Sequence, residues 1–231
     1  MIKNIYIFGC SGIAKSIYDS ILRSNQISFK NIYFVDADKK KTERVFYDGI
    51  TPIFLGDLNK KECYKQNVIF AFFKPENILN RKEIIDSYVK NFKFERITIV
   101  DSSAVISPSA RIGKGIFIGP NVVIDSDAVV SNDNIILFNT VVSREVRIGE
   151  NVFISANVVI KGSVEISESV FISASSIITN NIPSKVFINA GVMINSPLES
   201  NYIIGNKEIK NKVKIPIEYN KALRNLRFFH P

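Results

Sequence analysis

The sequence predicts two units of different fold class: an α/β unit with a parallel sheet, and after it a parallel β-helix. Three observations lead to this prediction. Aliphatic residues recur at every sixth position after Val100, strand-like runs alternate with helix-like segments before it, and a glycine-containing turn follows the first run. We place the units at residues 1–97 and 98–195, and treat 196–231 as a C-terminal extension.

The composition is that of a folded chain with a sizeable core. Its 231 residues are 46% hydrophobic and 23% charged, with a formal net charge of +8. The basic residues are scattered, so the charge reflects either compositional bias or attraction of phosphate-bearing small molecules. No stretch interleaves aromatic and basic residues as a nucleic-acid surface would, and no apolar run reaches the length of a membrane span. We expect neither partner.

Cysteine usage and the N-terminus indicate the compartment. Cys10 and Cys63 have no metal-binding or redox spacing. The chain enters a strand pattern at once, which leaves no room for a signal peptide. We therefore expect a cytoplasmic protein with free thiols and no metal.

The β-helix prediction depends on a strict period of six. Stepping by six from Val100 to Ile178 meets only Ile or Val, which fits neither the 3.6 period of a helix nor the 2 period of a hairpin strand. We call these the ladder positions, because they would stack inside a triangular coil of three short strands, about 18 residues per coil. Gly113, Gly119 and Gly149 each follow a ladder position, where we expect unusual backbone angles.

The α/β prediction rests on the segments before Val100. A buried strand at 4–9 leads through Gly9–Lys15 into a helix ending near Ser24, and further strands follow at 32–35 and 68–71, with a helix at about 76–89. A glycine turn at a helix N-terminus points backbone N–H groups at an anion. Asp36, at the end of the second strand, is placed to hold a ribose hydroxyl.

The glycine motif is incomplete for a dinucleotide, since Ser11 stands where the second glycine would be. We interpret the unit as binding a mononucleotide diphosphate and not NAD. A mere tight turn at Gly9 and Gly12, and a helix-capping role for Asp36, remain alternatives.

A small Rossmann-like domain joined to a hexapeptide β-helix resembles one family, the bacterial sugar O- and N-acetyltransferases. The family includes sialic acid O-acetyltransferases and N-acetyltransferases of nucleotide-linked 4-amino-4,6-dideoxy sugars. The resemblance, over about residues 2–195, implies a left-handed β-helix and a homotrimer that binds acetyl-CoA between neighbouring subunits. It also implies nucleotide-sugar contacts at Gly9, Cys10, Ser11, Gly12, Asp36, Ala37, Asp38, Phe72, Phe73 and Lys74.

One departure from the family affects the chemistry. The family's catalytic stretch, roughly Asn-Thr-x-x-Val-Val-Glu-His-Asp-x-x-Ile-Gly, aligns with Asn139–Gly149 and places the catalytic His at Arg144. The second family His aligns with Phe153, and the only histidine of the chain is His230. A sugar hydroxyl, with a pKa near the 15.7 of water, needs a base, whereas a sugar amine with a pKa near 8 is partly neutral at pH 7. The loss is therefore tolerable for N-acetylation and severe for O-acetylation.

Three residues are candidates for catalysis in place of the histidine. Asn139 would orient the sugar or the oxyanion, and Ser143 would hydrogen-bond the substrate. Glu145 would act as the base, although a strand neighbour of Arg144 should point to the opposite side. CoA contacts are assigned by position alone, to Phe153, Ser155, Ala156, Gly162, Ser173 and Ala174.

The sequence thus predicts an acetyl-CoA-dependent N-acetyltransferase. Its acceptor would be the amine of a UDP- or dTDP-linked amino-dideoxy sugar used in surface glycans such as lipopolysaccharide O-antigen. An O-acetyltransferase with an unrecognised base and a non-catalytic nucleotide-sugar-binding relative are the alternatives. In the extension we expect strands at 202–205 and 213–217 and a helix at 216–229, which together would cap the solenoid.

Overall fold

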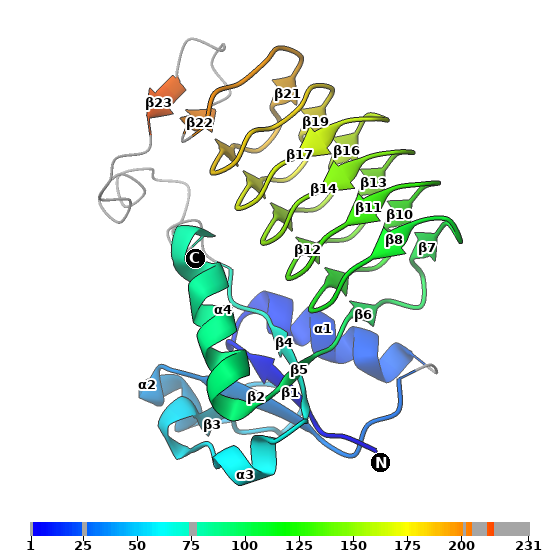
Figure 1. Ribbon diagram of the computed structural model, residues 1–231. Helices are drawn as coiled ribbons and strands as arrows, with labels where there is room; N and C mark the ends of the chain where they lie inside the picture. The colour runs from blue at the N-terminus through cyan, green and yellow to red at the C-terminus, as the bar shows by residue number, and fades with distance from the viewer. Residues whose placement is uncertain (1, 25–26, 74–77, 201, 205–211, 215–231) are drawn as a thin grey trace.

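The computed structural model describes residues 2–24, 27–73, 78–200, 202–204 and 212–214. It shows an α/β unit packed beside one end of a prism-shaped β-helix (Figure 1). Residues 2–97 are called the N-terminal unit below. Within the described residues, no helix combines the length and the apolar character needed to cross a membrane.

The N-terminal unit has one parallel sheet, with strand order β3-β2-β1-β4-β5. The predicted alternation of strands and helices is confirmed, and the structure adds β3 and β5, which at two residues each are too short to give a periodic signal. The strands are β1 (Ile5–Phe8), β2 (Ile32–Asp36), β3 (Ile53–Phe54), β4 (Asn67–Phe70) and β5 (Glu95–Arg96). The helices are α1 (Gly12–Arg23), α2 (Lys39–Thr42), α3 (Lys60–Cys63) and α4 (Ile78–Phe92), with a 3₁₀ turn at Leu55–Asp57.

Alternate side chains of β1 enter two different cores, as the period of a strand requires. Ile5 and Ile7 pack with α1 and with the outer surface of the β-helix. Tyr6 and Phe8 lie on the other face, in a core shared with α3, α4 and Phe94. The sheet is therefore covered by α1 and the β-helix on one face and by α3 and α4 on the other.

The β-helix has three flat faces, whose strands pair in parallel except for β23. Successive coils are 18 residues apart up to β19, as in the pairing of Val123 with Val141. The eight-stranded face contains β6 (Ile99–Val100), β9 (Phe117–Ile118), β12 (Ile135–Ile136), β15 (Phe153–Ile154), β18 (Phe171–Ile172), β20 (Phe187–Ile188), β22 (Tyr202–Ile204) and β23 (Lys212–Lys214). The six-stranded face contains β7 (Val105–Ile106), β10 (Val123–Ile124), β13 (Val141–Val142), β16 (Val159–Ile160), β19 (Ile177–Ile178) and β21 (Met193–Ile194). The four-stranded face contains β8 (Arg111–Ile112), β11 (Val129–Val130), β14 (Arg147–Ile148) and β17 (Glu165–Ile166).

The ladder prediction is confirmed. Every ladder residue from Ile118 to Ile178 is buried in one continuous core, and those of the first coil pack against it partly buried because no coil lies beneath them. The ladder also continues beyond the sequence prediction. One repeat is two residues shorter, so that Ile182 bridges to Ile166, and Ile188 and Ile194 then restore the period.

The expectation that Gly113, Gly119 and Gly149 adopt unusual backbone angles is wrong. From Ile112 to Ile172, the left-handed residue lies three positions after each ladder residue, and it is mostly Asn, Asp or Ser, as in Asn121 and Asn157. Short polar side chains tolerate this conformation better than other non-glycine residues. The glycines instead allow close stacking of coils: a Cβ on Gly149 would lie 2.8 Å from the backbone nitrogen of Glu168.

The C-terminal extension is described only at β22 and β23. β22 pairs with β20 in parallel, and β23 pairs with β22 in antiparallel orientation. Both lie within or next to the strands predicted there. The helix predicted at 216–229 lies outside the described residues.

Candidate functional site

A pocket of about 280 Å³ opens at the carboxyl ends of β1, β2 and β4 in the N-terminal unit. This is the edge at which open parallel sheets bind ligands. Its volume lies near the lower end of the range for small-molecule sites. The lining residues are Phe8, Gly9, Cys10, Ser11, Val35, Asp36, Ala37, Lys41, Leu55, Phe72, Phe73, Ile84 and Tyr88.

The loop after β1 is fitted tightly against the end of β4. Gly9 has a left-handed φ of +99°, and a Cβ there would lie 2.9 Å from the Cβ of Phe72, so both conformation and space require glycine. The Ser11 hydroxyl donates to the Ala71 carbonyl (2.9 Å) and accepts from the N–H of Ala14, which caps α1. The glycine turn therefore builds one wall of the pocket and starts the helix.

Asp36 is a buried carboxylate in the lining of this pocket. It accepts hydrogen bonds from the backbone N–H groups of Cys10 (2.7 Å) and Asp38 (2.9 Å), and the Lys41 ammonium lies 3.4 Å away. Burial would raise its pKa, but the two backbone N–H donors and Lys41 outweigh that effect and lower it. Asp36 is therefore an anionic acceptor at neutral pH, suited to N–H or O–H donors of a ligand.

Cys10 contributes its backbone and not its thiol chemistry. Burial, together with the neighbouring Asp36 carboxylate, raises the pKa of the thiol to about 12. A thiol in that state is almost entirely protonated at neutral pH and is a poor nucleophile.

The rest of the pocket is an apolar wall that sequence reasoning found only in part. Phe72 and Phe73 were predicted, whereas Leu55, Ile84 and Tyr88 were not. Tyr88 is on α4, and its ring lies 5.5 Å from that of Phe8. The missed residues come from two separate segments, the 3₁₀ turn and α4, so only the fold brings them together with the strand ends.

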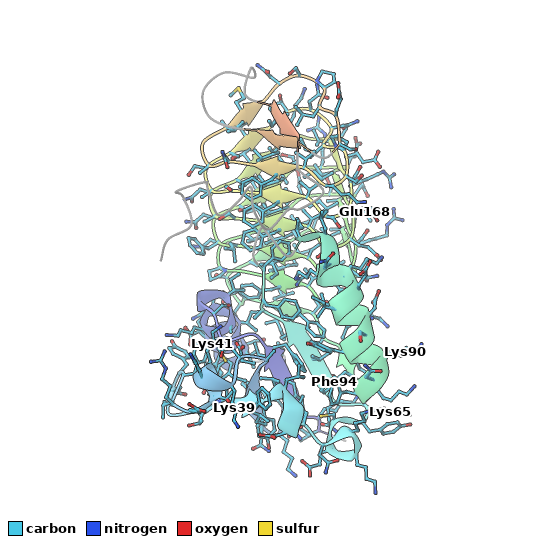
Figure 2. The ribbon with its side chains drawn as sticks, turned by 90° about the vertical axis from the view of Figure 1, so that its left-hand side faces the viewer. Lys39, Lys41, Lys65, Lys90, Phe94 and Glu168 are labelled. Atoms are coloured by element: carbon cyan, nitrogen blue, oxygen red, sulfur yellow. The ribbon has the colours of Figure 1, made fainter. Side chains whose placement is uncertain are left out.

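Lys41 was also missed, although it supplies the pocket with a cation. It belongs to the run Lys39–Lys41 that forms α2, just after the predicted acid. Lys39 and Lys41 lie on the outside of the N-terminal unit in Figure 2. The signal was present in the sequence, as a lysine run directly after the second strand.

Two predicted contacts are not part of this lining, and a third lies outside the described residues. Gly12 is the first residue of α1 and faces open space. Asp38 is exposed and caps α2 by accepting from the N–H of Lys40. Lys74 lies outside the described residues.

The predicted catalytic residues lie at corners of the β-helix. Asn139 occupies a left-handed position between the eight-stranded and six-stranded faces, where its side-chain oxygen accepts from Asn121 (3.2 Å). Ser143 and Glu145 lie at the next corner, between β13 and β14. Glu145 also has a left-handed φ (61°) and accepts from the Ser163 hydroxyl (2.7 Å). Glu145 is thus a turn residue, and the expectation that strand alternation fixes its direction is wrong.

Most predicted CoA contacts also lie at corners. Ser155, Ala156, Ser173 and Ala174 stack on successive coils between the eight-stranded and six-stranded faces. Gly162 lies at the corner after β16, where a Cβ would approach the Arg144 carbonyl at 3.3 Å. This places Gly162 directly above the position at which the family carries its histidine.

Phe153 is in a different place from the one expected. Its ring is buried on the outside of the eight-stranded face, stacked on Phe171 (4.6 Å) and packed against Phe73 (4.7 Å). It thus seals the contact between the N-terminal unit and the β-helix, and within one chain it has no open face for CoA. The physical reason is that the first residue of each two-residue strand points outward, and on this face outward means toward the N-terminal unit.

The pocket and the corner at Ser143 and Glu145 do not meet within one chain. The N-terminal unit packs on the eight-stranded face and on the corner that contains Asp133 and Asn151. In Figure 1, α4 runs along one side of the β-helix, and β7, β10 and β13 lie on the opposite side. Within the described part of the chain, neither Ser143 nor Glu145 forms a hydrogen bond with a residue of the pocket.

The described residues contain no group of three or more His, Cys, Asp or Glu side chains placed to hold a metal ion. The sole histidine, His230, lies outside the described residues, so it cannot be placed at either site. At the corner between β13 and β14, where the family carries its histidine, this chain has Arg144, whose side chain is exposed.

Comparison with known proteins shows which solved structures share this architecture. Residues 4–75 match the family described as the PglD N-terminal domain. The structure of PerB from Caulobacter crescentus, in complex with CoA and GDP-perosamine, superposes with a TM-score of 0.73 at 22% identity, over 88% of this chain and 94% of that one. The acetyltransferase domain of PglB from Neisseria gonorrhoeae gives 0.61 at 18% identity, over 82% and 97%.

WeeI from Acinetobacter baumannii gives a TM-score of 0.59 at 14% identity, over 90% of this chain and 98% of that one. No curated protein sequence matches the chain. These matches confirm the fold: an α/β domain that matches the PglD N-terminal domain is followed by a left-handed β-helix, as in the solved perosamine N-acetyltransferase.

Proposed function

We propose that this chain transfers the acetyl group of acetyl-CoA to the amine of a nucleotide-linked amino-dideoxy sugar in the synthesis of a surface glycan. The observation that carries the proposal is the presence, in one chain, of a charged, aromatic-walled pocket at the strand ends and a hexapeptide β-helix. PerB, whose structure superposes on this chain, is described with CoA and GDP-perosamine, and PglB with acetyl coenzyme A. We place the reaction in the cytoplasm, in line with the two free buried thiols.

The pocket offers groups that suit a nucleoside diphosphate. Asp36 is an anionic acceptor for base or ribose donors, and the walls of Phe72 and Tyr88 are suited to a planar ring. Lys41 and the N-terminal end of α1 supply positive potential for phosphates. A UDP- or dTDP-linked sugar is our prediction, and the GDP sugar of PerB is the competing nucleotide to be tested.

An amine acceptor fits the chemistry at the β-helix corner. Arg144 keeps its proton at neutral pH and cannot serve as a general base. A sugar amine with a pKa near 8 is about one-tenth neutral at pH 7, and this neutral fraction attacks a thioester without prior deprotonation. The tetrahedral intermediate then loses its proton to water or to the departing thiolate. Positioning of the two substrates supplies much of the rate.

Attack by the neutral amine without a general base predicts how the rate depends on pH. Without an enzymic base, the rate at low sugar concentration should follow ionisation of the amine, so it should rise about tenfold from pH 6 to pH 7 and level off above about pH 8. A profile that levels off near pH 6 to 7, where a histidine titrates, would contradict base-free attack.

We further propose that the chain acts as a homotrimer, because the pocket and the corner at Ser143 and Glu145 are apart in one chain and a second copy can bring them together. The six-stranded face carries an exposed aliphatic stripe of the kind that marks contact surfaces. Its outward residues are 36% to 62% exposed except for Val141, which is half-buried. The stripe consists of Val105, Val123, Val141, Val159, Ile177 and Met193.

Light scattering during size-exclusion chromatography tests the assembly. V159E should dissociate the wild-type assembly, whereas V129E, an outward residue of the four-stranded face, should leave it unchanged. A wild-type protein that elutes as a monomer, or equal behaviour of the two variants, would contradict the trimer.

Thiol release from acetyl-CoA tests the activity, with UDP-, dTDP- and GDP-linked amino sugars and their hydroxyl counterparts as acceptors. Activity confined to amino sugars is the expected result, and mass spectrometry should locate the acetyl group on nitrogen. D36N should raise the sugar KM about tenfold or more. D57N, which removes an exposed carboxylate of the nearby 3₁₀ turn, should not.

The second candidate is a non-catalytic relative that binds a nucleotide sugar. It is favoured by Arg144 at the corner where the family carries its histidine, and by the burial of Phe153. No thiol release with retained nucleotide-sugar binding would support it. Release with hydroxyl sugars would instead support an O-acetyltransferase in which Glu145 acts as base.

A further inference from the structure

Arg81 on α4 is completely buried, which is rare for a guanidinium. Burial lowers its pKa to about 9, and the nearby Asp133 carboxylate opposes that shift. Keeping such a group out of water is costly unless its donors are satisfied. The partners of Arg81 therefore show what the side chain is holding.

Two of its nitrogens hold the pocket wall. Nη2 donates to the Phe70 carbonyl (3.0 Å) at the end of β4, and Nε donates to the Phe72 carbonyl (2.9 Å) beyond that end. The guanidinium also lies over the Phe73 ring, 4.6 Å from its centroid. Phe72 and Phe73 both line the pocket, and past Phe70 the chain has left the sheet.

The third nitrogen holds the β-helix. Nη1 donates to the Asp133 carbonyl (2.8 Å) and to the side-chain oxygen of Asn151 (2.9 Å). These residues occupy equivalent left-handed positions on adjacent coils. The Asn151 amide in turn donates to the Ile78 carbonyl (2.7 Å) at the start of α4. One side chain thus joins the pocket wall, α4 and two coils.

Phe73 forms a second connection between the same parts. Its ring is packed between Arg81 on one side and Phe153 and Phe171 of the β-helix on the other, at centroid distances of 4.7 and 5.8 Å. Any displacement of the wall relative to the β-helix would break both the Arg81 hydrogen bonds and this ring stack.

We propose that Arg81 is a positioning residue: it fixes the Phe72–Phe73 wall of the pocket at a set place on the β-helix, so that a bound nucleotide sugar is presented in one orientation. The proposal rests on the proposed function, since it takes the pocket to be the nucleotide-sugar site. Burying a guanidinium carries a large desolvation cost even when its donors are satisfied, so stability alone does not account for a buried arginine here.

Lys82 provides a matched control. It is the next residue on α4 and also bridges to the β-helix, through an ion pair with Glu150. Lys82 is not part of the pocket lining, and its side chain is partly exposed. Figure 2 shows α4 running down from the level of Glu168 to Lys90, with the N-terminal end of the helix against the coils.

The test uses the full-length protein and the variants R81M, R81K, N151A and K82M, with two readouts. The first is titration calorimetry with UDP, dTDP and GDP, each alone. The second is hydrogen exchange of a peptide covering residues 64–73, compared with one from the β-helix. R81M should weaken binding of the preferred nucleotide about tenfold to a hundredfold and speed exchange of the 64–73 peptide selectively.

R81K should recover part of both effects, N151A should show smaller changes of the same sign, and K82M should match wild type. Unchanged binding and exchange in R81M, or equal changes in K82M, would overturn the positioning role. If R81M does not fold, R81K and N151A supply the comparison. If wild type binds none of the three nucleotides, the proposed nucleotide site is refuted, while exchange still decides whether Arg81 holds the wall.

Discussion

Replacing Gly149 with alanine tests the structural reason for the glycines of the β-helix. Gly149 follows a ladder residue, and an added Cβ would lie 2.8 Å from the Glu168 nitrogen and 2.9 Å from the Ser167 carbonyl carbon. Ordinary contacts begin near 3.4 Å, so the next coil would have to move by about half an ångström. The obstructing atoms are backbone, and no rotamer change relieves them.

The size of the effect follows from two opposing terms. Overpacking costs typically 1–3 kcal/mol, and we take about 3 kcal/mol because only backbone can give way. Loss of glycine entropy in the unfolded chain returns up to about 1 kcal/mol. We therefore expect G149A to lower the free energy of unfolding by about 2 kcal/mol.

The matched control is G12A, in which the same methyl group is added at the first position of α1, where it meets no atom within 4 Å. It should stabilise the protein by up to about 0.5 kcal/mol. Urea titrations followed by far-ultraviolet circular dichroism give both values, provided that the m-values agree. If the G149A midpoint equals or exceeds that of wild type, coil spacing does not explain these glycines.

Three further predictions concern buried polar groups. N134V should destabilise the protein by about 3 kcal/mol in the same titration, because it strands the Val152 N–H and two carbonyls that Asn134 now satisfies inside the prism. D101N should cost about 2 kcal/mol at pH 7, since hydrogen bonds from Ser20, Arg23 and Ser103 overcome burial and hold the Asp101 pKa well below its usual range. This contribution is present above the unfolded pKa of about 3.9 and is lost as pH falls toward the folded value, so wild type and D101N should converge in acid melts. Cys10 should resist iodoacetamide at pH 8 and react only in urea, as mass spectrometry would show, because its pKa is raised to about 12 by burial.

The period of six made most of the β-helix predictable. Ladder residues such as Ile124 and Ile136 are buried. A smaller or polar residue at an inward position would leave a cavity or place a polar group in the core, so the pattern of Ile and Val is strict. The left-handed corner was misplaced for a physical reason. Glycine is the residue usually associated with positive φ, yet here mostly Asn, Asp and Ser take that conformation, and glycines such as Gly149 are used where a neighbouring coil leaves no room for a Cβ.

The pocket was predictable only where strand ends carried a recognisable residue. Gly9, Ser11 and Asp36 follow β1 or lie at the end of β2, and the parallel sheet brings those ends together. Tyr88 and Ile84 come from α4, whose placement depends on the buried contacts of Arg81. Sequence alone does not reveal that an arginine in a helix will be fully buried, so this part of the site had no local signal.

The outward residues of the β-helix carry a second pattern, with a period of eighteen and not six. On the eight-stranded face they are large and buried, with Phe171 stacked between Phe153 and Phe187 of the neighbouring coils. On the six-stranded face they are aliphatic and exposed, as at Val159, and on the four-stranded face they include the charged residues Arg147 and Glu165. The inward positions thus specify the prism, and the outward positions specify what each face meets: the N-terminal unit, water or, as we propose, another copy. Phe153 was assigned to CoA by its position relative to the family pattern, which does not show which way its side chain faces. The period of eighteen separates Phe153 from Ser155, two residues on, which lies at the adjoining corner and remains available to a cosubstrate.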